Sequence, residues 1–542
     1  MNPKEIIKKS IVKLGLGVEN FSVEHPADEA KGDYATNVAM VMGGNPRVNA
    51  EKIVEDLKKD KDLGEVVDLE RIEIAGPGFI NFFLTDKYIS SKLLIGENLG
   101  KSDWMKGKKV LVEYSSPNIA KRFSVGHFRS TLIGQALFNL YKKSGAKVTN
   151  DNHLGDWGTQ FGMITAAVKM WGFDWSIDDP IGKLEDLYVR FNKEMAEKPE
   201  MRDVARDEFL RLEKGDIGAR EIWQKSIDVS MKEFGEIYKK LEVSFEHQNG
   251  ESIYEKMMPP IIHECLEKKV AEVGEGGALI VRFEKDGKEY FPPAMLRKSD
   301  GSTTYFTRDL ATIRKRLNDD DLKCDLYIYE VGSEQTMHFR QVFEAVEKLG
   351  WANKNIFKHV QHGLLTLPEG KMSTRKGNTI KLDDLLGRAE EKSPELAIAS
   401  VKYNELKRSP IMNYVFDWDE ALSMEGNSAP YINYAYVRAT KILEGKNIVQ
   451  DDLVFEGEEK DLARFLLRFV LGEEVEKAAS GFAPQSICTY VYELAKRFNG
   501  FYERNKVLGD PRERQRLALV SLVREVIKRG LETLGIKVVE AM

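Results

Sequence analysis

Residues 109–145 read KVLVEYSSPNIAKRFSVGHFRSTLIGQALFNLYKKSG, and this stretch decides the fold class. The apolar run that begins at Val110 predicts a strand buried on both faces, as in parallel sheets. After Gly126, apolar residues recur every three or four positions, which predicts a helix that ends near Gly145. Residues 124–127 therefore fall at a helix N-terminus that follows a buried strand.

A helix N-terminus attracts anions, because its first backbone N–H groups are free and its dipole is positive there. Gly126 allows a phosphate to approach the backbone closely. A nucleotide phosphate is therefore a natural ligand for residues 124–127. An ordinary βα unit with a solvated His127 explains this stretch equally well, so the rest of the chain has to decide.

Size and composition describe a multidomain globular protein. The 542 residues suffice for three or four domains, and 42% hydrophobic with 31% charged residues argue against disorder. No apolar run approaches the roughly 18 residues of a transmembrane helix, and the first residues lack a signal-peptide pattern, so we expect a cytoplasmic protein. Cys265, Cys324 and Cys488 form no CxxC motif, so neither a disulfide framework nor protein-bound zinc is expected. The net charge of −6 gives no overall nucleic-acid signature, although it does not exclude local basic faces.

Strands and helices alternate on either side of a charged, helix-patterned segment at about 180–270, to which we assign no chemistry. This alternation predicts a parallel sheet interrupted by a helical insertion. The glycine-rich segment DNHLGDWGTQFG (151–162) follows a predicted strand and so lies where ligands bind in such sheets. A tight loop with satisfied polar groups is the alternative. Around 278–295, the sequence predicts a hairpin closed by Asp286 and Gly287.

The two ends of the chain differ from its middle. Residues 1–100 suggest a small α/β unit that includes a strand pair at 71–85, and residues 396–542 have helical periodicity throughout. Aromatic residues in the helical part could stack on unpaired bases, but aromatics at helical spacing are more often core. The polar loop KMSTRKGN (371–378) is either a mobile phosphate clamp or a surface turn.

Taken together, these segments resemble the arginyl-tRNA synthetases, a class I aminoacyl-tRNA synthetase family, over nearly the whole chain. VEYSSPNIAK followed by SVGHFRST is similar to the family signature that contains its His-x-Gly-His motif, and KMSTR is similar to its Lys-Met-Ser-Lys-Ser loop. NHLGDWGTQFG, YFTRDLA, GSEQTMHF and GNSAPYINYAYVR resemble further family segments. SVGH alone would be weak, whereas this ordered set is specific.

The resemblance implies an α/β protein of three parts. Residues 101–395 would form a Rossmann-like catalytic domain with a parallel sheet and a helical insertion at about 180–270. Residues 1–100 would form a small α/β domain that contacts tRNA, and residues 396–542 an all-helical anticodon-binding domain.

The resemblance also implies a reaction in protein biosynthesis. ATP and L-arginine would form an arginyl-adenylate, and tRNA(Arg) would then accept the arginyl group, with release of AMP and diphosphate. Mg²⁺ would accompany ATP, and no metal would be bound by the protein itself. A cytoplasmic monomer without a membrane partner is expected.

The implied site residues fall into three groups. Catalysis and ATP binding are expected of Lys121, Ser124, Gly126, His127, Lys371, Met372 and Ser373. Arginine binding is expected of Glu113, Asn118, Tyr305, Asp309 and Gln335, of which the two acids would accept a guanidinium. tRNA binding is expected of Asn37, Tyr431, Asn433, Tyr434 and Arg438.

The chain departs from the class I pattern at two places. Thr374 stands at the second lysine of the Lys-Met-Ser-Lys-Ser loop, where Lys121 is expected to substitute. Ser124 replaces the first histidine of the other motif, and Arg122 replaces a usual proline. Serine can donate a hydrogen bond but carries no imidazolium charge, which Arg122 could partly restore.

These departures keep other functions open. A synthetase-like protein that binds tRNA without charging it is the main alternative. A small-molecule nucleotidyltransferase would have no use for the C-terminal helical domain. A cysteinyl-tRNA synthetase is disfavoured by the absence of zinc ligands.

Overall fold

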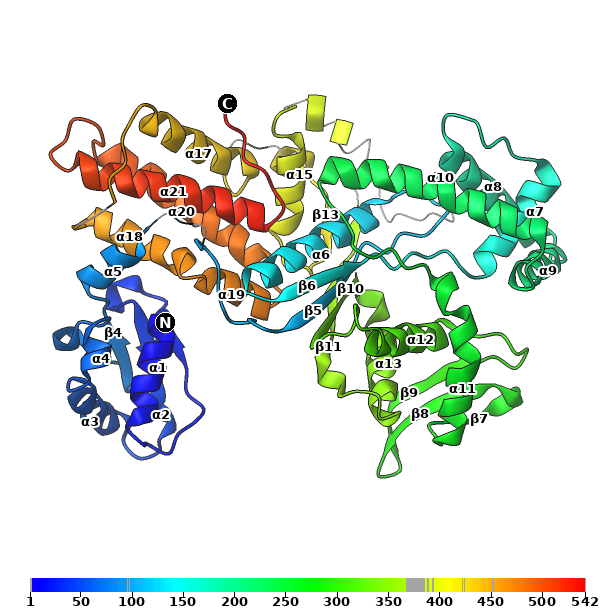
Figure 1. Ribbon diagram of the computed structural model, residues 1–542, viewed down its shortest axis with the longest axis horizontal. Coiled ribbons are helices and arrows are strands. Elements are labelled where there is room, and N and C mark those ends of the chain that lie inside the picture. The colour runs from blue at the N-terminus through cyan, green and yellow to red at the C-terminus, as the bar shows by residue number, and fades with distance from the viewer. Residues whose placement is uncertain are drawn as a thin grey trace.

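The computed structural model in Figure 1 describes residues 2–94, 96, 98–366, 386–387, 389–391, 394–421, 423, 425–450 and 453–541. A parallel sheet lies at the centre, a small α/β unit and a helical bundle lie on one side, and the insertion lies on the other (Figure 1). None of the helices in these ranges combines the length and the apolar character needed to cross a membrane.

The central sheet has four strands, and every neighbouring pair is parallel, which confirms the predicted parallel sheet. The order is β11 (Phe357–His362), β10 (Leu326–Gly332), β5 (Lys109–Glu113) and β6 (Lys147–Asp151). The chain continues from β5 to β6 on one side and later adds β10 on the other. The crevice at this change of direction, beyond the carboxyl ends of β5 and β10, is where ligands bind in open α/β sheets.

Helix α6 (Val125–Lys143) is buried between two layers. It packs against β5, β6 and β10 on one side and against helices of the C-terminal bundle on the other. Gly134 is needed for this contact, because an added Cβ would lie 2.1 Å from the Cβ of Tyr114, the residue after β5. The N-terminus of α6 is thereby fixed next to the end of the central strand.

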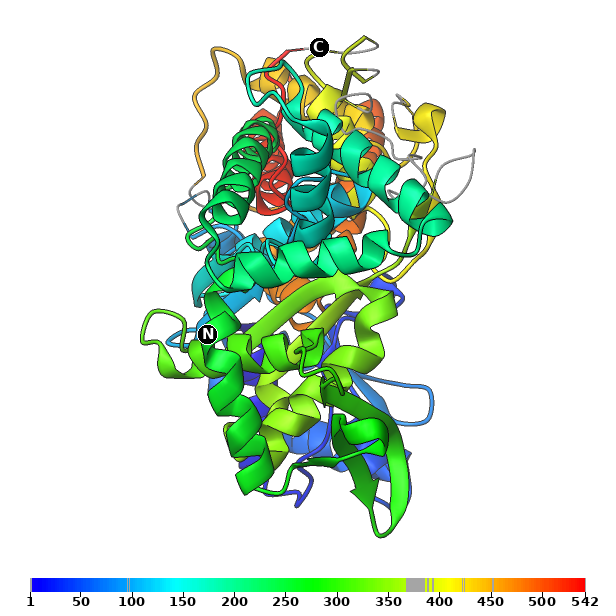
Figure 2. The same ribbon diagram turned by 90° about the vertical axis from the view of Figure 1, so that its right-hand side faces the viewer.

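The predicted insertion is helical. It comprises α8 (Pro180–Glu197), α9 (Met201–Glu213), α10 (Ile217–Leu241) and α11 (Met258–Glu267), preceded by α7 (Thr159–Trp171). Figure 2 shows α7, α8, α9 and α10 above an antiparallel sheet of β7 (Ala271–Val273), β8 (Leu279–Lys285) and β9 (Lys288–Arg297), whereas α11 packs beside this sheet against β7. The predicted hairpin is confirmed, since Asp286 and Gly287 close it with φ of +53° and +73°.

Two helices flank the strand β10 of the central sheet. Helix α12 (Tyr305–Asn318) precedes β10, and α13 (Thr336–Lys348) connects β10 to β11. A short parallel pair of β12 (Leu365–Thr366) and β13 (Tyr414–Val415) follows.

The N-terminal unit is a four-stranded sheet in the order β1-β2-β4-β3, and the predicted strand pair is its β3 and β4. Its elements are α1 (Pro3–Lys13), β1 (Val23–Glu24), β2 (Tyr34–Thr36), α2 (Val38–Val41), α3 (Pro46–Leu57), α4 (Lys61–Gly64), β3 (Glu73–Ala75), β4 (Phe79–Phe82) and α5 (Asp86–Lys92). Ion pairs attach it to the helical bundle: Asp33 contacts Arg464 at 2.5 Å, and Glu29 contacts Arg497 at 2.8 Å.

The C-terminal part is helical, as predicted. It contains α15 (Ala397–Leu406), α16 (Trp418–Ala421), α17 (Ala429–Leu443), α18 (Glu458–Val470), α19 (Glu473–Ser480), α20 (Gln485–Arg504) and α21 (Glu513–Thr533). The last helix packs against α17, α18 and α20 and forms the centre of this bundle.

Candidate active site

The loop between β5 and α6 has an unusual backbone. Ser115, Ser116 and Ala120 have φ of +73°, +45° and +58°, a region that side chains other than glycine rarely adopt. Such strain is found at ligand sites, where the surrounding structure holds it in place. Here the loop brings residues 121–127 over the carboxyl edge of the sheet.

Ser124 is the N-cap of α6. Its Oγ accepts the backbone N–H of His127 at 3.4 Å, and its own N–H donates to Nδ1 of His127 at 3.2 Å. This reciprocal pair satisfies two N–H groups in the manner of a capping box. Serine is among the best N-cap residues, so Ser124 stabilises the helix terminus, a role that its motif position did not suggest.

The same contacts fix the state of His127. Because Nδ1 accepts a backbone N–H, the ring proton of the neutral form sits on Nε2. Desolvation, together with the nearby charges of Lys121 and His362, lowers the pKa of His127 to about 4. His127 is thus a neutral donor at pH 7, and Lys121 supplies positive charge beside it.

The end of β11 adds a second histidine, which the sequence reasoning missed. His362 lies 2.8 Å from Oε1 of the buried Glu330. Burial disfavours the charged ring, but the adjacent Glu330 carboxylate outweighs this and raises the pKa of His362. Lys371, Met372 and Ser373, expected in the loop that follows this strand, lie outside the described residues.

Glu113 occupies the end of β5 as predicted, but it already has a cationic partner. Its Oε2 lies 2.5 Å from Nη2 of Arg316, which also contacts Asp151 at 2.7 Å. Arg316 is fully buried and belongs to α12. A guanidinium of the chain itself therefore contacts Glu113, the acid expected to bind a substrate guanidinium.

Asp309 lies on the same helix, seven residues before Arg316. This spacing places both residues on one face of α12, about 10 Å apart along the axis. Asp309 is partly exposed, and its Oδ2 lies 2.5 Å from Nε2 of His338 on α13. Tyr305 lies one turn earlier and is 67% exposed. The face of α12 thus carries an accessible carboxylate beside an accessible phenol.

Glu251 is a further acidic residue of this region. The sequence reasoning missed it because no chemistry was assigned to the predicted insertion. Glu251 contacts Nη1 of Arg308 at 3.0 Å. Burial raises the pKa of Glu251 to about 7, and Asp309 and Asp156 add to this effect, while Arg308 opposes it. The carboxyl groups of Glu251, Asp156 and Asp309 are therefore close enough to interact electrostatically.

Asn118 and Gln335 frame this region. Asn118 lies against Gly155, where an added Cβ would be 2.4 Å from its Oδ1, so glycine allows the two loops to meet. Gln335 is exposed at the start of α13, one turn before His338. Through Gly155, the glycine-rich segment 151–162 contacts the loop that follows β5.

The expected positive contribution of Arg122 is contradicted by its contacts. Its Nη2 pairs with Asp179, and its Nε lies 3.7 Å from Glu185. Two carboxylates therefore compensate the charge of Arg122.

Within the described residues, no group of three or more His, Cys, Asp or Glu could hold a metal ion.

Three of the expected tRNA contacts form one surface cluster. Arg438 donates to Tyr434 Oη at 2.8 Å and to Asn499 Oδ1 at 2.9 Å, and Asn499 donates to Tyr431 Oη at 3.2 Å. Asn433, which was also expected to contact tRNA, is 0% exposed in this structure. Its Oδ1 accepts the N–H of Val539 at 3.0 Å and so anchors the C-terminal segment.

Asn37, the expected tRNA contact in the N-terminal unit, is partly buried. Its Oδ1 accepts the N–H of Ser22 at 2.8 Å. Its side chain thus fixes the local loop.

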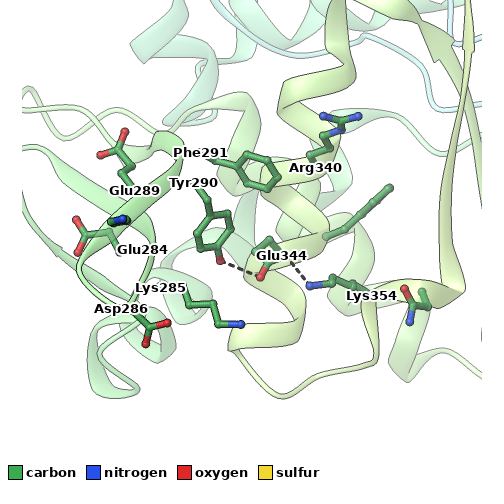
Figure 3. Close-up of a pocket in the computed structure, with 12 residues that line it drawn as sticks. Glu284, Lys285, Asp286, Glu289, Tyr290, Phe291, Arg340, Glu344 and Lys354 are labelled. Atoms are coloured by element: carbon green, nitrogen blue, oxygen red, sulfur yellow. Dashed lines mark hydrogen bonds and ion pairs between the residues drawn. The ribbon is translucent and has the colours of Figure 1, made fainter.

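Two cavities lie near these elements. One, of about 910 Å³, lies between the β8–β9 hairpin and α13, where Glu344 binds Tyr290 and Lys354 (Figure 3). The other, of about 580 Å³, is lined by Tyr305 and Arg308. The second cavity borders the Asp309 face of α12, whereas the first opens on the hairpin.

We expect His127 to stay neutral, with its proton on Nε2, down to about pH 4. Its folded pKa lies below the ordinary 6.5, so the unfolded chain binds the proton first, and stability falls as the pH drops from 6.5 toward 4. ¹⁵N NMR of histidine-labelled protein, assigned with His127→Gln, measures both the tautomer and the titration. A midpoint near 6.5, or a proton on Nδ1, would contradict this geometry.

Known proteins match the whole chain. Family models match "Arginyl tRNA synthetase N terminal domain" at residues 2–84, "tRNA synthetases class I (R), catalytic domain" at 89–397 and "DALR anticodon binding domain" at 432–542. An arginine–tRNA ligase of Fusobacterium nucleatum is 38% identical over 95% of this chain and 94% of its own, and one of Halothermothrix orenii is 36% identical over 99% and 98%. The solved arginyl-tRNA synthetase of Plasmodium falciparum superposes with a TM-score of 0.83 at 26% identity, over 99% of this chain and 98% of that one. The chain belongs to the arginyl-tRNA synthetase family.

Proposed function

We propose that this protein ligates L-arginine to tRNA(Arg) in two steps at the carboxyl edge of its parallel sheet. The arginine carboxylate attacks the α-phosphate of ATP, which forms arginyl-adenylate and releases diphosphate. The 2′-hydroxyl of the terminal tRNA adenosine then attacks the activated carbonyl, and AMP leaves. The observation that carries the proposal is the accessible carboxylate of Asp309, on a helix anchored to the end of β5 beside the capped N-terminus of α6.

ATP would bind at the N-terminus of α6. The free N–H groups there and the missing side chain of Gly126 suit a phosphate. His127 would donate its Nε2–H to a phosphate oxygen, and Lys121 would balance the negative charge that develops during transfer. Ser124 holds this terminus in shape. Lys371, Met372 and Ser373 remain part of the proposal from sequence alone.

Mg²⁺ would arrive with the phosphates of ATP. It would neutralise part of their charge, which is its usual contribution to such reactions. The described residues offer no metal-binding cluster of their own, and the proposal requires none.

The arginine side chain would bind at the Asp309 face of α12. A guanidinium has five N–H donors in a rigid fork and pairs best with carboxylates. Asp309 would be the main acceptor, with Tyr305 and Gln335 at the rim and Asn118 across the loop. Glu113 would add negative potential from the strand end while it stays paired with Arg316.

The outer parts of the chain would bind tRNA. We infer that residues 1–100 contact its body and that residues 396–542 contact the anticodon, with the cluster of Tyr431, Tyr434 and Arg438 on that surface. A cytoplasmic monomer completes the proposal, and the three free cysteines are consistent with a reducing compartment.

The alternative, a tRNA-binding relative without charging activity, rests on Ser124 and Arg122. It is not favoured, because the full length of the chain matches arginine–tRNA ligases and Ser124 has a structural function as the helix cap.

An arginine- and tRNA-dependent ATP–diphosphate exchange assay tests the function. We expect exchange by the native protein, and we expect Asp309→Asn to raise KM for arginine by roughly ten- to hundredfold, because a charged hydrogen-bond partner is worth about 1.5–3 kcal/mol. KM for ATP should stay within about threefold of the native value. Asp319→Asn, at the far end of α12, is the control, and its KM values for arginine and for ATP should both stay within about threefold. tRNA binding without exchange would favour the alternative, and equal rises in both constants for Asp309→Asn would reject the assigned pocket.

The tRNA surface is tested by Tyr434→Ala and Arg438→Met. Each removes part of one exposed cluster, so we expect KM for tRNA to rise roughly five- to fiftyfold, since a stacked base or a phosphate contact contributes about 1–3 kcal/mol. ATP affinity should not change. Arg504→Met, which removes an exposed arginine of the neighbouring helix α20, serves as the matched control. Equal losses of affinity for ATP and for tRNA would disprove the assignment. An Arg504→Met control whose KM for tRNA rises as much as in the two variants would also disprove it.

A further inference from the structure

Arg122 joins the loop before α6 to the insertion helix α8. Its Nη2 bonds to Oδ2 of Asp179, the N-cap of α8, and its Nε lies 3.7 Å from Glu185, six residues further along the chain. Asp179 also uses its other oxygen, Oδ1, to accept the N–H of Gly182 at 3.0 Å. The carboxylate that holds Arg122 is therefore itself held by the helix backbone.

The guanidinium lies directly against the first turn of α8. An added Cβ at Gly182 would lie 1.8 Å from Nη2 of Arg122, closer than any real contact. The absence of a side chain at Gly182 thus makes room for this guanidinium. The contact requires matching residues on both sides, an arginine in the loop and a glycine in the helix.

Lys121, the neighbour of Arg122, rests on the same helix face. Its Nζ lies 5.1 Å from the ring centroid of Tyr188, in a cation–π arrangement. Gly182, Glu185 and Tyr188 are spaced by three residues and so form one stripe along α8. Two consecutive cationic side chains of the loop therefore dock on one stripe of the insertion.

This docking involves the end of the loop next to the N-terminus of α6, where we propose that ATP binds. Lys121 lies close enough to His127 to lower its pKa, and Ser124, two residues after Arg122, is the N-cap of α6. Ala120, just before, has φ of +58° and donates its N–H to Ser230 Oγ on α10 at 2.9 Å. Residues 120–123 also contact the insertion through the hydrogen bond of Ala120, the cation–π contact of Lys121, and the ring of Phe123, which packs against Phe234 and Tyr238 of α10.

We propose that Arg122 is a positioning residue for adenylate formation, which docks the loop on α8 and thereby holds Lys121 beside His127. The inference rests on the proposed function. Arg122 replaces a proline that is usual in the resembling motif, so a side-chain contact does here what a restricted backbone would do there. Because Asp179 and Glu185 compensate its charge, Arg122 acts through loop position and not through its own field at the phosphates.

The test compares Arg122→Met, Arg122→Lys and Gly182→Ala with Arg190→Met, a control that removes an arginine of α8 whose contacts are with Trp171 and Glu194. In the exchange assay we expect Arg122→Met and Gly182→Ala each to lower kcat about tenfold, since small misplacements of reacting groups are costly. KM for arginine should stay within about twofold. Arg122→Lys should recover part of kcat, because it keeps the cation without the planar fork.

The double variant Arg122→Met/Gly182→Ala distinguishes positioning from general damage. We expect it to be no slower than either single variant, because both disrupt the same contact. His127 should titrate at higher pH in Arg122→Met once Lys121 is released. A wild-type kcat in Arg122→Met would overturn the inference. So would a double variant whose loss of kcat is the sum of the two single losses and parallels its fall in the midpoint of thermal unfolding. If native protein shows no exchange, the proposed function itself fails, whereas an active native protein with unaffected variants overturns only this inference.

Discussion

The buried guanidinium of Arg316 is the contact on which the site depends. It bridges Glu113 and Asp151, which lie side by side at the carboxyl ends of β5 and β6. Burial opposes its charge, but the two carboxylates outweigh this and raise the pKa of Arg316 further above its ordinary value. Removal of one member of such a buried set commonly costs about 3–5 kcal/mol, because the others stay charged without a partner. This bridge presses α12 onto the strand ends and so places Asp309 and Tyr305 at the rim of the crevice.

The second requirement is the N-terminus of α6. Gly134 lets the helix approach Tyr114 closely, and the Ser124–His127 pair closes its first turn. The chemistry then follows from position: free N–H groups, a neutral imidazole with its proton on Nε2, and the ammonium of Lys121 gather where phosphates would lie. A serine in place of the motif's first histidine costs a potential charge, yet it gives the helix one of the best caps available.

Local sequence pattern predicted much of the fold. Hydrophobic periodicity located β5 and α6, alternation predicted the parallel sheet, and turn chemistry predicted the Asp286–Gly287 hairpin. It failed where long-range partners decide. Nothing near Asn433 indicates that it binds the backbone of Val539, and nothing near Glu113 indicates Arg316, which is about two hundred residues away along the chain. Glu251 and the partners of Arg122 lie in or near the charged insertion, where a pairing side chain and a solvated one have the same local pattern.

The most direct test is a crystal structure with L-arginine and a non-hydrolysable ATP analogue. The guanidinium should lie within hydrogen-bond distance of Asp309, with Arg316 still bound to Glu113 and Asp151. The phosphates should lie at the N-terminus of α6 within reach of Nε2 of His127. A guanidinium bound away from Asp309, or an Arg316 displaced from Glu113 by the substrate, would contradict the account.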